Sequence, residues 1–141
     1  MAITFEELLP LFSLHGDASI SEQAPVHDKT NIVRTSEGWQ VKVDWHAHGP
    51  LNFVVCGTWK ITVYLEQMGG GEFSLSGNTA TEPCVSAPHA YSKIMLFGAG
   101  SVPAGLYRAS VVITLEGSTG VPGPIAGHED LGLIQFYDSG I

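Results

Sequence analysis

The chain has 141 residues, and its six Lys and Arg against 14 Asp and Glu give a formal net charge of −8. Charged residues make up only 14% and hydrophobic residues 44%, which is too apolar for an intrinsically disordered chain and fits one folded domain. The few scattered basic residues argue against a nucleic-acid partner, because neutralising phosphates requires clustered Lys and Arg. No apolar run reaches the roughly 18 residues of a membrane span.

The N-terminus indicates a reducing compartment, and this determines how the two cysteines are interpreted. The first ten residues lack a basic segment, and Glu6 and Glu7 interrupt the apolar stretch that a secretory signal needs. We therefore expect a cytoplasmic protein, with export by a route without a signal peptide left open. Cys56 and Cys84 show no CxxC spacing and are expected to be small hydrophobic residues, with a disulfide between them as the alternative.

The first 30 residues differ in pattern from the rest and are expected to form an N-terminal arm. Residues 3–12 are rich in apolar side chains and are expected to form a short helix, with Thr4 and Glu7 as its capping box. Residues 13–30 are polar and show no clear period, so they are expected to be irregular. The predicted organisation is an arm over residues 1–30 and one domain over residues 31–141.

From residue 31 onward the pattern predicts strands. In residues 38–48 apolar side chains alternate with polar ones, and this period of two indicates one buried and one solvated face. Strands are expected over 31–36, 38–48, 57–67, 72–76, 90–97, 106–116 and 131–138. Seven strands separated by turns, with hardly any helix, predict an all-β antiparallel sandwich of two sheets.

The start of the strand over 106–116 has a more specific motif. Gly105-Leu106-Tyr107 resembles the tyrosine corner of immunoglobulin-like and fibronectin type III-like sandwiches. The resemblance implies a Greek-key sandwich in which the Tyr107 hydroxyl bonds to the backbone of the preceding turn and Trp59 lies in the core. Ala109 stands where antibody-type domains have a cysteine, so the chain resembles a relative without that disulfide. The fold hosts many functions, and none is implied by the resemblance.

The best chemical candidate is the segment Asp44-Trp-His46-Ala-His48. Its spacing puts three polar side chains on one face of a strand, with neighbours about 7 Å apart. Two imidazoles and a carboxylate can bind Zn, Cu or Fe(II), and His-x-His on a strand is similar to the start of the metal site in copper–zinc superoxide dismutases. The closely spaced downstream histidines of that site are absent. The alternative is a solvated polar face that happens to hold two histidines.

More histidines lie elsewhere in the chain. His15, His89 and His128 fall in the arm or in loops of the predicted domain, and any of them could complete the site in the fold. No nucleophile lies in a recognisable activating motif, so an enzyme activity is not supported by the sequence.

The strand over 90–97 is apolar on both faces, with Ile94 and Leu96 opposite its other hydrophobic side chains. A sandwich strand needs only one apolar face, so the second must be covered, either by the N-terminal arm or by another subunit. The candidate interface residues are Phe5, Leu8, Leu9, Phe12, Tyr91, Met95 and Phe97.

These patterns favour a non-catalytic module for protein interaction or self-assembly, with the arm as docking segment, a homo-oligomer as its expected state and no cofactor. The alternative is a metal-binding protein or metal-dependent oxidoreductase that holds Zn or Cu at Asp44, His46 and His48. Ligand or carbohydrate binding by the loops at one end of the sandwich is a third hypothesis.

Overall fold

The computed structural model describes residues 3–6, 13–23, 30–49, 57–117 and 122–138, and this part of the chain contains ten strands and no helix. It therefore includes no helix that is long and apolar enough to cross a membrane. The strands are β1 (Thr4–Glu6), β2 (Ser13–Glu22), β3 (Ile32–Arg34), β4 (Trp39–His48), β5 (Thr58–Gln67), β6 (Glu72–Phe73), β7 (Thr79–Pro83), β8 (His89–Phe97), β9 (Gly105–Glu116) and β10 (Pro122–Tyr137).

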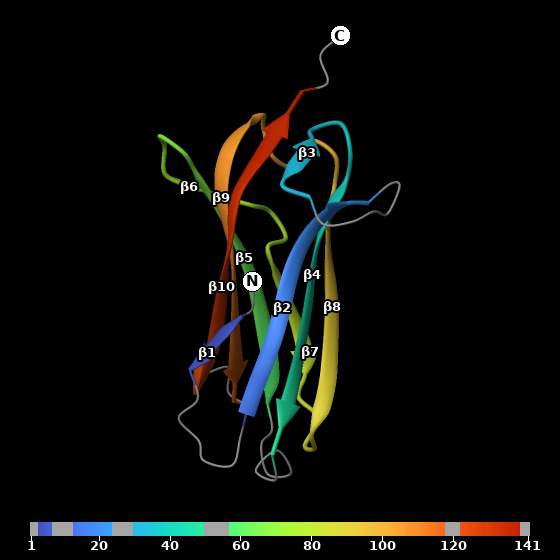
Figure 1. Ribbon diagram of the computed structural model, residues 1–141, viewed down its shortest axis with the longest axis vertical. Coiled ribbons are helices and arrows are strands. Elements are labelled where there is room, and N and C mark those ends of the chain that lie inside the picture. The colour runs from blue at the N-terminus through green and yellow to red at the C-terminus, as the bar shows by residue number, and fades with distance from the viewer. Residues whose placement is uncertain (1–2, 7–12, 24–29, 50–56, 118–121, 139–141) are drawn as a thin grey trace.

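The strands form two sheets that pack as a β-sandwich (Figure 1). The larger sheet has the order β1-β10-β9-β5-β6, with β3 also pairing with β10 and β7 also pairing with β5. The smaller sheet has the order β2-β4-β8 and is antiparallel throughout. The Ile3 amide donates a hydrogen bond of 2.9 Å to the Gly16 carbonyl, which ties the residue before β1 to β2.

Aromatic side chains from both sheets fill the core. Along β4, buried and more exposed residues alternate, so Trp39 and Trp45 point inward while His46 and His48 point outward. Trp45 of the small sheet packs edge-on against Trp59 of the large sheet, with ring centroids 5.9 Å apart. Burying these rings supplies much of the hydrophobic stabilisation, because each aromatic side chain removes a large apolar area from water.

The predicted strands from residue 38 onward agree well with the structure. The expected strands over 38–48, 57–67, 90–97 and 106–116 correspond to β4, β5, β8 and β9. The expected strand over 131–138 is the second half of β10, which begins at Pro122. The short strand β7 was not predicted.

The prediction for the N-terminal segment was wrong where the structure describes it. Thr4–Glu6 is a strand and not part of a helix, because it pairs with β10; the rest of the predicted helix, with Glu7, lies outside the described residues. Residues 13–22 are strand β2, which pairs with β4 along its whole length, and not an irregular arm.

A glycine at an inward position interrupts the alternation of apolar and polar residues in the sequence of β2. Leu14, Ala18 and Ile20 are buried, and Gly16 lies between them opposite Trp45. A Cβ at Gly16 would lie 2.5 Å from the Asp44 carbonyl oxygen and 2.8 Å from the Trp45 Cβ, so a side chain there would collide with β4. The glycine that weakens the apolar pattern is therefore what lets the two strands approach.

Two residues predicted to be structural lie in the core. Trp59 is fully buried, and the Tyr107 hydroxyl donates a hydrogen bond of 3.0 Å to the carbonyl oxygen of Pro103. Burial raises the pKa of the Tyr107 phenol above its usual value. The contact ties the start of β9 to the turn before it.

The candidate interface residues on β8 face the core, and not the outer surface where an interface would need them. Tyr91, Met95 and Phe97 are buried inside the sandwich, because they alternate onto the inner face, while Ile94 and Leu96 are 49% and 66% exposed on the outer face. Of the remaining candidates, the structure describes only the backbone of Phe5, and Leu8, Leu9 and Phe12 lie outside the described residues, as does Cys56. Cys84 is half-buried.

Candidate metal centre

Three histidines meet on the outer face of the small sheet. His46 and His48 are two residues apart at the end of β4, so their side chains share a face. The antiparallel register of β2 and β4 places His15 directly opposite His46 and Ser13 opposite His48. Strand geometry alone thus brings three imidazoles from two segments, more than 30 residues apart in sequence, to one end of the sheet.

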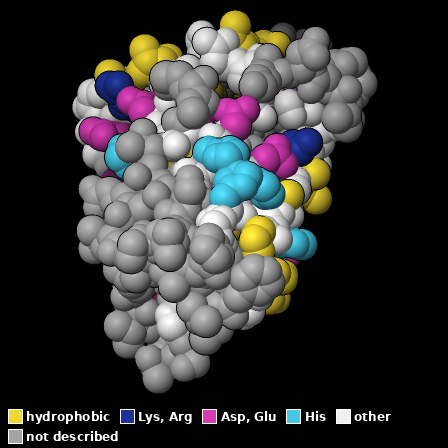
Figure 2. Space-filling model, turned by 60° about the horizontal axis from the view of Figure 1, so that its bottom comes forward, with side chains coloured by type: hydrophobic (Ala, Val, Ile, Leu, Met, Phe, Trp, Pro, Cys, Tyr) yellow, Lys and Arg dark blue, Asp and Glu magenta, His cyan; other side chains and the backbone are white. Residues whose placement is uncertain are grey.

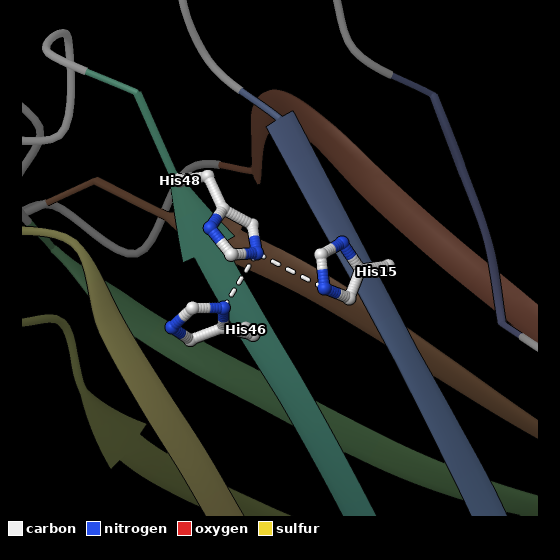
Figure 3. A group of neighbouring side chains, drawn as sticks. All are labelled: His15, His46 and His48. Carbon is white, nitrogen blue, oxygen red and sulfur yellow. Dashed lines mark hydrogen bonds between the residues drawn. The ribbon is translucent and has the colours of Figure 1, made fainter.

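The ring nitrogens converge on one point (Figure 3). The His46 Nδ1 lies 2.5 Å from the His48 Nε2, which in turn lies 3.0 Å from the His15 Nε2. One ligand atom from each of the three residues lies within 4.8 Å of the others. Two nitrogens on a tetrahedral zinc ion, each about 2.0–2.1 Å from it, are about 3.4 Å apart, so small rotations of the rings would admit an ion.

The surroundings of His48 favour its neutral form. Burial lowers the pKa of His48 below its usual value, and the neighbouring His46 and His15 lower it further. A neutral imidazole has one N–H and one lone pair, and the lone pair is what binds a metal ion. The lowered pKa of His48 therefore makes loss of its proton easier before any ion arrives.

Solvent reaches the three side chains. Figure 2 shows the imidazoles grouped at the surface, with acidic side chains near them. His15 is exposed, and His46 and His48 are half-buried. An ion can therefore enter directly from solution.

A depression of about 330 Å³ lies beside the cluster. Its lining residues are His15, Asp17, Asp44, Trp45, His46, Ala90, Tyr91 and Ser92. The register arranges the outward residues that line the depression in two rows across β2, β4 and β8. One row is His15, His46 and Ala90, and the next is Asp17, Asp44 and Ser92.

The structure places the other candidate ligands outside the cluster. Asp44 shares the outer face with the histidines, but its carboxylate lies 3.9 Å from the Lys42 ammonium and is not among the converging ligand atoms. His89 contacts the Tyr91 ring, and His128 lies on β10 of the other sheet. The converging set in the described part of the chain is thus His15, His46 and His48, with His15 in the position that the sequence had left open.

A different polar cluster lies on the outer face of the large sheet. The Arg108 guanidinium donates to the Asp130 carboxylate at 3.0 and 2.6 Å, and the Gly132 amide donates to the same carboxylate at 2.9 Å. The hydrogen bonds from Arg108 and then from Gly132 lower the pKa of Asp130. Here each charged group already has a partner of opposite charge.

Comparison with known proteins gives the fold and no function. No family model matches the chain, and no curated protein matches it. A solved structure described as the crystal structure of the C-terminal domain of wzt is similar, with a TM-score of 0.60 at 10% sequence identity over 94% of this chain and 81% of that one. This likeness supports a β-sandwich and carries no information about the residues of the site.

Proposed function

We propose that the protein binds one divalent transition-metal ion, of the Zn²⁺ or Cu²⁺ kind, through His15, His46 and His48. The observation that carries this proposal is the convergence of three ring nitrogens from two paired strands. Imidazole is a good ligand for both zinc and copper. Among the divalent first-row transition-metal ions, Cu²⁺ generally binds such sites most tightly.

The alternative of an incidental polar face accounts less well for the distances. At 2.5 and 3.0 Å the nitrogens are within hydrogen-bond range, but three clustered imidazoles on an exposed face gain little by crowding together in water. A metal ion gives all three lone pairs a common partner. The lowered pKa of His48 keeps that lone pair available near neutral pH.

The test is native mass spectrometry and calorimetry on the full chain without a histidine tag. We expect one Zn²⁺ or Cu²⁺ per chain, and a metal affinity at least about 100-fold weaker in His46→Ala. Loss of a residue that only hydrogen-bonds to a metal ligand typically weakens metal binding about 10–100-fold, and loss of a ligand itself should cost more. His128→Ala is the matched control, since His128 is an exposed histidine on the other sheet. Binding that is absent, or that weakens equally in both variants, would contradict the proposal.

We also propose that the sandwich is of the immunoglobulin-like Greek-key type and associates with a second copy of itself. The hydrogen bond from Tyr107 to Pro103 supports the first statement, and the exposure of Ile94 and Leu96 supports the second. Sedimentation of the wild type and of an Ile94→Ser/Leu96→Ser variant tests the association. A wild type that stays monomeric at every concentration would contradict it.

A further inference from the structure

The three histidines leave a coordination position open. A zinc or copper ion held by three protein nitrogens takes at least one further donor, which in open sites comes from water or another ligand. Within the described residues no other His, Cys, Asp or Glu places a ligand atom in the cluster. The fourth donor must then come from a group outside this set.

The depression beside the cluster offers room for such a donor. His15 and His46 belong both to the cluster and to the lining of this depression, so the depression adjoins the proposed site. Ala90 and Ser92 of β8 have small side chains, and they leave the hollow next to the larger His46 and Asp44. The volume of about 330 Å³ exceeds the roughly 30 Å³ of one water about tenfold, which is enough for a five-membered ring.

Asp44 provides a second contact point in the same space. Its side chain is half exposed, and its ion pair with Lys42, at 3.9 Å, is long and open to solvent and therefore weak. The carboxylate has lone pairs left to accept hydrogen bonds. An imidazole bound to a metal ion usually donates its other N–H to a carboxylate or carbonyl, and this outer contact strengthens binding.

We propose that the open position binds a ligand of the imidazole class, seated over Ala90 and Ser92, with its free N–H donated to the Asp44 carboxylate. This inference rests on the proposed metal site. The ligand combines one lone-pair nitrogen for the ion with one N–H for Asp44, and it is either a small molecule or a histidine side chain of a second copy of this chain.

The test compares two probes that differ in one N–H. The full chain is loaded with Cu²⁺ and titrated with imidazole and with 1-methylimidazole, and the shift of the copper absorption band reports binding. We expect imidazole to bind about 10-fold more tightly, and Asp44→Ala to remove most of that advantage while leaving 1-methylimidazole unchanged. Native mass spectrometry checks that copper stays on the protein throughout.

The possible results separate this inference from the metal site itself. If the protein binds no copper, the proposed function fails. If copper binds but neither probe shifts its band, or if Asp44→Ala weakens both probes equally, the inference is overturned and the metal site stands. Sedimentation of the copper-loaded chain identifies the source: a copper-dependent dimer supports a histidine from a second copy, and a monomer that binds imidazole supports a small ligand.

Discussion

The outer faces of the two sheets carry polar clusters of opposite character. On the large sheet, Arg108 and Asp130 have opposite charges and hold each other, with the Gly132 amide completing the set. On the small sheet, His15, His46 and His48 are residues of one kind, and a ring nitrogen of each of the first two lies within hydrogen-bond distance of the His48 Nε2. The first cluster pairs opposite charges, and the second brings together three groups of the same kind.

A polar group that stabilises the fold and a group that binds a ligand differ in whether their hydrogen-bonding atoms already have partners. Arg108 already donates two hydrogen bonds to Asp130, so a ligand that takes either group would have to replace these bonds. The imidazole cluster instead brings three ring nitrogens close together, and a metal ion stabilises such an arrangement by binding their lone pairs. Adding an ion should therefore change one face of the molecule and leave the other unchanged.

The largest expected effect is stabilisation of the whole fold by zinc. At a free Zn²⁺ concentration 100 times the dissociation constant, binding to the native state alone adds about 2.7 kcal/mol. For a domain of this size that corresponds to a rise in Tm of about 10 °C, measured by thermal denaturation of the untagged chain. Zinc should raise the Tm of Arg108→Met as much as that of the wild type, and it should not raise the Tm of His48→Ala. An equal response of all three proteins would contradict the contrast between the clusters.

A second substitution tests whether the close approach of β2 to β4 builds the histidine site. Gly16→Ala adds a Cβ that meets the Asp44 carbonyl and Trp45, and such overpacking typically costs about 1–3 kcal/mol. We expect a lower Tm and also weaker zinc binding, because β2 positions His15. Gly71→Ala is the control, since a Cβ at Gly71 meets nothing within 4 Å. Unchanged zinc affinity in Gly16→Ala would mean that the site does not depend on this contact.

The strand β4 and the two histidines on it could be predicted from the sequence because its period of two is unbroken. Trp39, Val41, Val43, Trp45 and Ala47 are all buried, as the alternation predicts. The same pattern placed Asp44 on the correct face, but residues two apart on a strand are about 7 Å apart, and the pattern does not tell which side chains turn toward each other.

The partner strand could not be recognised in the same way. In β2 the inward positions are Leu14, Gly16, Ala18 and Ile20, and two of these four are too small to mark a hydrophobic face. The pairing of His15 with His46 depends on the register between segments that are distant in the chain, and that register is fixed by packing and not by local sequence. The sequence signal that could have identified this strand is the alternation of small or apolar residues with polar ones over 13–21.

A third and smaller effect concerns the ion pair between Arg108 and Asp130. A double-mutant cycle with Arg108→Met and Asp130→Asn should give a coupling energy of at most about 1 kcal/mol, because both side chains are largely exposed and solvent screens their attraction. Urea denaturation of the wild type, both single variants and the double variant measures it. A coupling well above this value would show that the Arg108 pair contributes more to the fold than its exposure suggests.

The smallest effect is the pH dependence of the Asp130 contribution, which falls in a different pH range from that of zinc binding. Because the pKa of Asp130 is lowered below its usual 3.8 in the folded protein, its contribution to stability is present above about pH 4 and is lost as the pH falls through the lowered value. Zinc stabilisation should disappear at a higher pH than this, because protons compete with the ion for imidazole nitrogens, which bind protons more tightly than carboxylates do. Urea denaturation at pH 7.5, 5 and 3, with and without zinc, measures both.

The Arg108→Met variant is the control. It should lose only the change in stability near pH 4, since without the guanidinium the main cause of the lowered pKa of Asp130 is gone. A zinc effect that persists at pH 5 would instead place the ion on carboxylates, which stay ionised there.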